Sequence, residues 1–130
     1  MSDASAPPAH YVRIVTGDDG ETHLHDVSLP EALAPTEHGV PPLSVSEAVP
    51  VDRVEFVGVD GDGQDPGWHN APRRQLVVFL TGWVRIEVSD GEVRTLPVGS
   101  VVLAEDLTGP GHVTTHEAGP QRVLVIPLEP

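Results

Sequence analysis

The chain contains no cysteine and no lysine, so all seven of its basic residues are arginine. Without cysteine there are no disulfides, no thiolate nucleophile and no cysteine-ligated zinc site. The wealth of Ala, Val, Gly, Pro and Arg beside the missing Lys is typical of GC-rich coding and indicates a bacterial source.

Positive charge is scarce as well, with 7 basic against 20 acidic residues and a formal net charge of −13. Nucleic-acid binding needs a basic patch that contacts phosphates, so we expect no nucleic-acid partner. An acidic surface also disfavours docking on anionic membranes, so we expect no membrane partner.

Long hydrophobic runs are absent from the sequence, and no apolar stretch is long enough to cross a bilayer. The first ten residues, MSDASAPPAH, have neither the cationic start nor the apolar core of a secretory signal peptide. We therefore expect a cytoplasmic protein.

The length of 130 residues fits one domain of ordinary size. Residues 1–10 are small, polar and Pro-rich, so we expect a flexible N-terminal tail there, followed by a single domain over 11–130. The segment 30–42 carries four prolines, which exclude a helix of useful length.

Most of the domain alternates between short β-type runs and Gly/Pro turns. In WVRIEVSDG (83–91), Val84, Ile86 and Val88 fall on one face of a strand and charged residues on the other. The DG at its end is a hairpin-turn signal. Many short strands at regular spacing are typical of an all-β sandwich or small barrel. The expected strands cover 11–15, 21–29, 43–51, 52–60, 75–80, 83–91, 92–96, 100–104, 112–118 and 122–128.

Two segments of the sequence have a residue spacing that indicates a functional site. In PGWHNAPRRQLVVFLTG (66–82), Gln75 precedes Gly82 by seven residues, and His69 and Ala71 lie before it. Residues an even number apart on a strand face the same way. The side chains at 69, 71 and 75 are therefore expected to converge.

The second set lies farther along the chain. Gly99 is followed by SVVLA and then by the loop EDLTGPG, which starts at Glu105 and leads to His112. Both sets resemble the motifs of the cupins, G-x5-H-x-H-x3,4-E-x6-G and G-x5-P-x-G-x2-H-x3-N. By this resemblance, motif 1 lies at about 66–82 and motif 2 at about 99–116.

The resemblance covers about residues 43–128 and implies an all-β fold, the cupin double-stranded β-helix or jelly-roll barrel. Similar small single-domain cupins of bacteria, mostly without assigned function, carry a WH-x-AP-RRQ strand and an E-D-x-T-G-x-G-H loop like those of this chain. Cupins host many chemistries, so the fold alone assigns none of them. The resemblance also implies a homodimer, which is physically reasonable because open sheet edges need cover.

In cupins, residues at these positions bind one divalent metal through two His, a Glu and a third His. Here His69 and His112 remain, Ala71 has no donor atom, and Gln75 replaces the carboxylate with a neutral amide. We therefore expect no cofactor. The alternative is a single divalent transition metal (Fe, Mn, Ni, Cu or Zn) held by His69, Gln75 and His112.

Without a metal, the same positions form a polar cluster in an apolar cup, which is typical of a small-molecule site. Imidazoles titrate near neutral pH, so we expect His69 and His112 to act as a catalytic acid/base pair. We expect a small organic carbonyl or carboxylate compound as ligand, and an enzyme of the isomerase, cyclase or lyase type. The alternatives are a mononuclear metal-dependent dioxygenase and a non-catalytic ligand-binding or sensing protein. The expected ligand-binding residues are Trp68, Arg73, Gln75 and His116.

Some of these residues have simpler interpretations. His69 can satisfy backbone groups at the start of a strand, Arg73 can pair with a surface carboxylate, and His116 can lie at the rim of the barrel. Under each of these interpretations the residue has a structural role and no role in the site.

Two further pairs carry weaker signals. Glu105 and Asp106 resemble paired carboxylates for acid/base work, but we expect a Glu-Asp at the start of a loop to be solvated or to cap the following turn. His23 and His25 resemble an H-x-H ligand pair, but we expect them on an exposed edge.

Overall fold

The described part of the chain is all-β. The computed structural model describes residues 6–34, 43–60, 67–117 and 119–129, and these contain eleven strands and no helix. Accordingly, no helix that could span a membrane is found in them. The strands are β1 (His10–Thr16), β2 (Thr22–Ser28), β3 (Glu31–Ala34), β4 (Leu43–Ser46), β5 (Glu55–Val59), β6 (Gln75–Phe79), β7 (Val84–Val88), β8 (Val93–Leu96), β9 (Val101–Ala104), β10 (His112–His116) and β11 (Gln121–Pro127).

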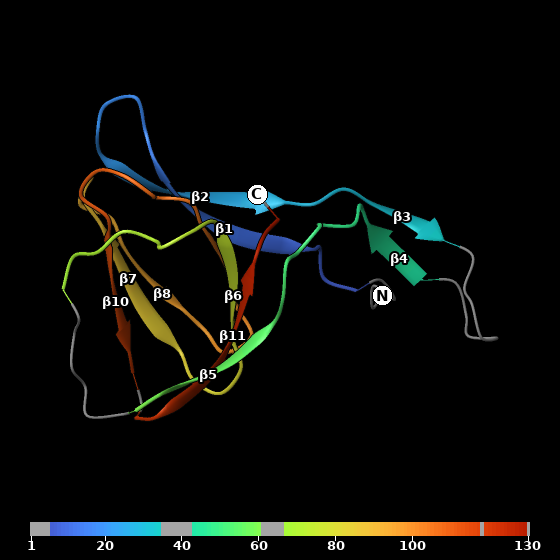
Figure 1. Cartoon of the computed structure of the whole chain (residues 1–130). Coiled ribbons are helices and arrows are strands. Elements are labelled where there is room, and N and C mark those ends of the chain that lie inside the picture. Colours follow the sequence, from blue (N-terminus) through green and yellow to red (C-terminus); the bar gives the residue numbers. More distant parts are fainter. Residues whose placement is uncertain (1–5, 35–42, 61–66, 118, 130) are drawn as a thin grey trace, which may run out of the picture.

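The strands form two larger sheets and one small one (Figure 1). The first sheet has the strand order β2-β1-β9-β6-β11-β5, and the second, which faces it, has the order β10-β7-β8. The hairpin of β3 and β4 forms the third sheet and projects away from the other two (Figure 1). This arrangement confirms the expected all-β jelly-roll fold class.

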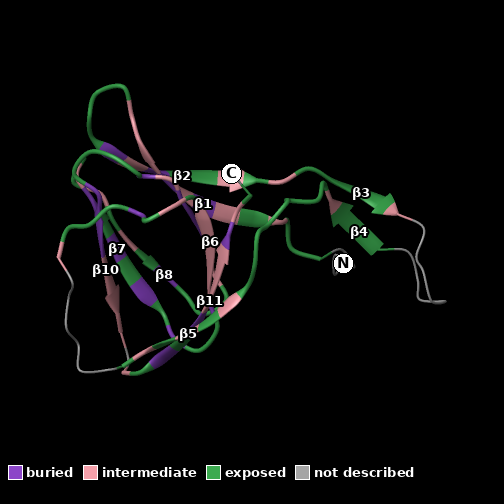
Figure 2. Cartoon of the chain, viewed as in Figure 1, coloured by how far each residue is buried: buried purple, intermediate pink, exposed green. Residues whose placement is uncertain are grey.

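The core lies between the two larger sheets. Val84, Ile86 and Val88 of β7 are at most 1% exposed, whereas Arg85 and Glu87 between them are exposed (Figure 2). The predicted alternation along this strand is confirmed. The first sheet contributes the other side of the core, with Val12, Ile14, Leu24, Phe79, Val102 and Val123.

The first sheet begins at the end of the segment for which a flexible tail is expected. β1 begins at His10, and the Ala9 carbonyl accepts a hydrogen bond from the Leu29 amide (2.9 Å), which extends the ladder between β1 and β2. Residues 1–5 lie outside the described residues.

The Pro-rich segment 30–42 contains a strand that the sequence did not predict. β3 forms in it and pairs antiparallel with β4, because proline excludes a helix but leaves extended backbone available. The rest of the segment, 35–42, lies outside the described residues, as do residues 61–66.

A buried threonine ties the start of β10 to β2 and to the β7–β8 turn. The Thr22 side chain is 0% exposed. Its hydroxyl donates to the Gly111 carbonyl (2.8 Å) and accepts from the Ser89 amide (2.8 Å). Since Gly111 directly precedes β10, this contact holds the first residue of that strand, His112, in position.

His69 and His112 are joined backbone to backbone. They form an isolated antiparallel bridge with N-to-O distances of 3.1 Å and 2.9 Å. Gly111 permits this approach: its φ is +80°, and a Cβ on it would lie 2.2 Å from the His69 carbonyl oxygen. The juxtaposition of the two histidines therefore depends on a glycine at 111.

We expect Gly111→Ala to lower the free energy of unfolding by about 2–5 kcal/mol, because its methyl group meets both a positive φ and the His69 carbonyl. Gly20→Ala is the matched control, since its φ is +81° and a Cβ there would meet nothing within 4 Å. The control should lose only about 1–2 kcal/mol. Urea denaturation followed by circular dichroism measures both variants, and equal losses would contradict the close approach at residue 111.

Candidate functional site

A cavity of about 380 Å³ lies between the two larger sheets. This volume is in the range of small-molecule sites. Most of the lining is apolar, so a hydrogen bond made inside the cavity meets little competition from water. The apolar lining residues are Ile14, Val59, Ala71, Pro72, Val77, Phe79, Ile86, Val102, Ala104, Val123 and Val125.

The strand β10 supplies three of the polar side chains in this lining, because alternate residues of a strand face the same way. His112 and His116 are its first and last residues, so they lie roughly 13 Å apart along the strand, with Thr114 between them. The remaining polar lining residues are His69 and Gln75.

His112 is held by a buried carboxylate. Its Nδ1 lies 2.6 Å from Oδ2 of Asp106, and the two residues are 6% and 0% exposed. Because a carboxylate accepts, the imidazole donates through Nδ1–H and keeps Nε2 for a molecule in the cavity. An Asp that orients a His in this way is the arrangement of a general base.

Asp106 is fixed in turn by the segment that precedes β6. Its backbone carbonyl accepts hydrogen bonds from the Ala71 amide (3.3 Å) and from Nδ2 of Asn70 (3.1 Å). The same Nδ2 donates to the Gly109 carbonyl (3.1 Å). The loop after β9 is thereby tied to the residue next to His69.

His69 lies beside His112 at the cavity, with ring centroids 4.7 Å apart and planes tilted by 52°. Its Nδ1 lies 2.9 Å from the Gly67 carbonyl, which accepts, so Nε2 again remains for a ligand. Unlike His112, His69 is exposed and can exchange protons with water. The simpler interpretation, that His69 only satisfies backbone groups, therefore accounts for one of its two ring nitrogens and leaves the other without a role.

His116 is oriented by an amide at the far end of β10. Its Nδ1 lies 2.9 Å from Oε1 of Gln121, whose Nε2 donates to the carbonyls of Trp83 (2.8 Å) and Glu117 (2.7 Å). Those two bonds fix the Gln121 amide, so its Oε1 must accept from His116. All three cavity histidines are thus bound through Nδ1.

Gln75 presents an unsatisfied amide to the cavity. Its Oε1 is buried and has no hydrogen-bond partner among the described residues. A buried acceptor without a donor costs free energy, so this position favours a ligand or water that donates a hydrogen bond.

Glu105 anchors the same loop through a pair of arginines. Its carboxylate accepts from Nε of Arg13 and from Nε of Arg74, the latter at 2.6 Å, and its side chain is 13% exposed. Burial raises the pKa of Glu105, but the two guanidinium groups outweigh burial and hold that pKa below the ordinary value.

The expectation that Glu105 and Asp106 are solvated or cap the following turn is therefore wrong. One carboxylate is covered by two guanidinium groups and the other lies behind the ring of His112. Sequence reasoning missed Asp106 as the partner of His112, and also missed Asn70. The only signal was an acidic residue six positions before a histidine, which does not show that its side chain is buried.

Two of the expected ligand-binding residues do not line the cavity. Trp68 is 49% exposed and is not among the lining residues. Arg73 lies in the bent segment before β6, where strand parity does not apply, and it pairs with Glu55 (3.4 Å). The other two, Gln75 and His116, line it.

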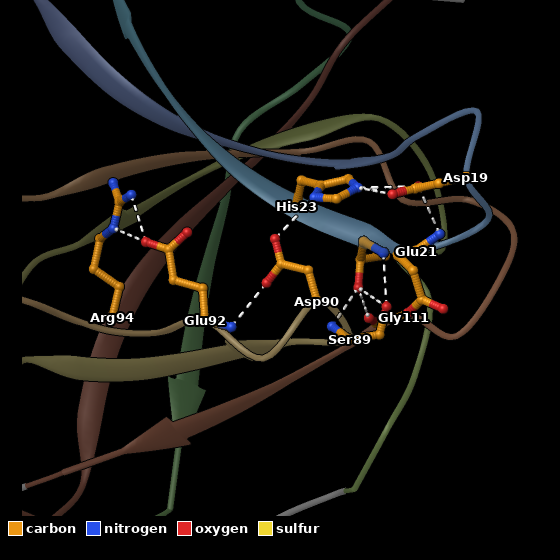
Figure 3. Close-up of polar contacts among 9 residues, drawn as sticks. Asp19, Glu21, His23, Ser89, Asp90, Glu92, Arg94 and Gly111 are labelled. Atoms are coloured by element: carbon orange, nitrogen blue, oxygen red, sulfur yellow. Dashed lines mark hydrogen bonds and ion pairs between the residues drawn. The ribbon is translucent and has the colours of Figure 1, made fainter.

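His23 and His25 lie on β2, an edge strand of the first sheet. The ring of His23 lies between the carboxylates of Asp19 (2.9 Å) and Asp90 (2.8 Å), and these raise the pKa of His23 (Figure 3). His25 is exposed. Neither His23 nor His25 lines the cavity.

The residues at the cavity do not fit a tightly held divalent metal. Among the described residues, no group of three or more His, Cys, Asp or Glu side chains could hold a metal ion. The donors expected from the sequence, His69, Gln75 and His112, are two imidazoles and one neutral amide, and Ala71 adds none. The Asp106 carboxylate binds the back of His112, so among the described residues no carboxylate lines the cavity to offset a dication.

No protein-family model matches the chain, and no curated protein matches it. One solved structure with a similar chain path is protein NMB1881 from Neisseria meningitidis, at 18% sequence identity and a TM-score of 0.43. The match covers 61% of this chain and 79% of that one. A likeness this distant assigns neither a family nor a function.

We expect Glu105→Gln to lower the free energy of unfolding at neutral pH by about 1–3 kcal/mol, because it weakens charge-assisted hydrogen bonds from Arg13 and Arg74. The pKa of Glu105 is lowered by folding from an ordinary value of 4.5. Its contribution is therefore complete above that value and is lost as the pH falls through the folded pKa.

Urea denaturation of wild type and variant across acidic pH measures this difference, which should shrink below about pH 4.5. Glu87→Gln is the matched control, since Glu87 is exposed on the outward face of β7, and it should change little at any pH. A Glu105→Gln difference that stays constant into strong acid would contradict the lowered pKa.

Proposed function

We propose that the protein is a small-molecule-binding enzyme of the isomerase, cyclase or lyase type that moves protons with histidine in its cavity. One observation carries the proposal: His112, bound at Nδ1 by the fully buried Asp106, lines an apolar cavity beside His69. A neutral imidazole backed by a carboxylate is a competent general base.

The simplest reaction is the transfer of a proton next to a carbonyl group. Nε2 of His112 takes a proton from the carbon adjacent to the carbonyl, and the Asp106 carboxylate stabilises the imidazolium that forms. The bound substrate becomes an enolate or enol. Return of the proton at a different atom gives an isomer, with no oxidant or co-reactant needed.

Two neighbouring groups support this step. The NH2 of Gln75 can donate to the substrate oxygen as negative charge develops there, once the amide turns that way. His69 lies 4.7 Å from His112 between ring centroids and is exposed, so it can deliver or remove the proton exchanged with water. The two histidines then act on one substrate from adjacent positions.

Two alternatives make different predictions for the same cavity. A mononuclear dioxygenase would need a metal on His69, Gln75 and His112, and its activity would be lost on chelation. A sensing protein would bind its ligand without transforming it. The buried Asp106 favours the catalytic proposal, because a binding site alone does not need a carboxylate behind its histidine.

We expect the protein to catalyse hydrogen–deuterium exchange in D2O at the carbon next to a carbonyl group. The probes are a panel of small ketones, hydroxyketones and lactones, and proton NMR measures the exchange. His112→Gln should slow this exchange about 10²–10⁴-fold, because it removes the base. Asp106→Asn should slow it without abolishing ligand binding. His25→Gln, on the edge strand β2, is the control and should exchange at the wild-type rate.

The outcome separates the three functions. Exchange that survives treatment with a chelator and depends on His112 supports the proposal. Loss of activity on chelation and its return with a divalent transition metal would favour the dioxygenase. Tight binding of a panel member with no exchange would contradict catalysis and favour sensing.

We also propose that the chain forms a homodimer, with the β3–β4 hairpin of one copy covering the apolar surface around Phe56 of the other. Leu33 and Leu43 of the hairpin are 77% and 55% exposed, and Phe56 on the edge strand β5 is 71% exposed. Among the described strands, β3 and β4 pair only with each other. A lone hairpin is marginally stable in water, so this one needs a covering partner.

We expect light scattering coupled to gel filtration to give the mass of a dimer for the wild type at micromolar concentration. Phe56→Asp and Leu33→Asp should each yield a monomer, because a buried unpaired carboxylate disrupts the interface. Val93→Asp is the control: Val93 is 51% exposed on β8 of the other sheet, and its substitution should leave the dimer intact. A monomeric wild type would contradict the proposal.

A further inference from the structure

The cavity has no fixed positive charge. The seven basic side chains of the protein are all arginines within the described part of the chain, and none of them lines the cavity. Arg85 and Arg122 are exposed on the outward faces of β7 and β11. The others are in ion pairs with carboxylates, namely Arg13, Arg53, Arg73, Arg74 and Arg94.

The polar groups that face the cavity are mainly hydrogen-bond acceptors. His69, His112 and His116 each have Nδ1 bound to an acceptor, which leaves the lone pair of Nε2 on each neutral ring. The buried Oε1 of Gln75 is a fourth acceptor without a partner among the described residues. A ligand that satisfies these atoms must donate hydrogen bonds.

We propose that the natural ligand is an uncharged, largely apolar molecule that carries hydroxyl groups, such as a phenol, an enol or a hydroxyketone, and that carboxylates are excluded. The inference names the ligand class of the cavity described above, and its catalytic meaning rests on the proposed function. It narrows the substrate expected from the sequence, which was either a carbonyl compound or a carboxylate.

The electrostatics disfavour an anion at this site. A carboxylate that enters an apolar cavity loses its hydration, and only a cation or several donors could compensate for that loss. This cavity has no cation in its neutral state, and among its described lining side chains only the Gln75 amide and the Thr114 hydroxyl can donate. The formal net charge of −13 adds long-range repulsion. A hydroxyl group gives up much less hydration and donates directly to Nε2 or to the Gln75 oxygen.

Three probes of nearly the same shape test the inference: 2-naphthol, 2-methoxynaphthalene and 2-naphthoate. Titration calorimetry at pH 8 should give tighter binding of 2-naphthol than of 2-methoxynaphthalene by about tenfold, because the ether cannot donate. 2-Naphthoate should bind about 100-fold more weakly than 2-naphthol, because its charge is buried without a cation.

A charge-bearing variant provides the reverse test. Gln75→Lys places an ammonium group at the cavity and should shift the ratio of 2-naphthoate to 2-naphthol affinity towards the anion by about tenfold. Ser44→Lys adds the same charge on the remote hairpin strand β4 and should leave that ratio unchanged. If Gln75→Lys fails to fold, the ranking of the three probes on the wild type still decides.

The inference is overturned if 2-naphthoate binds the wild type as tightly as 2-naphthol, or if none of the probes binds at millimolar concentration. Failure of the proposed function looks different: 2-naphthol would bind with the expected ranking while no carbonyl compound undergoes exchange. The opposite result, exchange of a carboxylate-bearing substrate, would keep the catalytic role and overturn the ligand class.

Discussion

The buried hydrogen bond between Asp106 and His112 is the interaction on which the candidate site depends. A fully buried carboxylate is stable only with a strong partner, and His112 supplies a ring N–H at 2.6 Å. The loop that carries Asp106 must therefore lie directly behind β10. Its position is secured at both ends, by the arginines on Glu105 and by Asn70.

The same principle orients the other two cavity histidines. Each ring is bound through Nδ1 by an acceptor of a different kind: a backbone carbonyl for His69 and the amide oxygen of Gln121 for His116. The Nε2 atoms are thereby left for a ligand. Because the lining between them is apolar and contains no arginine, the cavity combines weak solvation with several acceptors. This combination supports the proposals of an uncharged hydrogen-bond donor as ligand and of a histidine as catalytic base.

Much of the fold was predictable from the sequence, since strand patterns are local. The alternation at Val84, Ile86 and Val88 sets which face of β7 is buried, and turn residues mark most strand ends. The strand at 31–34 was missed because proline-rich segments give no periodic signal. The convergence of positions 69, 71 and 75 was expected from strand parity. It occurs instead through a bend, with His69 bridged to β10 and Gln75 at the start of β6.

The sequence by itself determined the all-β class and the absence of lysine and cysteine chemistry, because these follow from residue types and local patterns. Its two spaced motifs also singled out His69 and His112. Only the tertiary structure decided which carboxylate reaches His112, that Arg73 and Trp68 do not line the cavity, and that every arginine lies outside it. Those features depend on contacts between residues far apart in the chain. A local sequence pattern cannot predict such contacts, because they form only when the two sheets pack against each other.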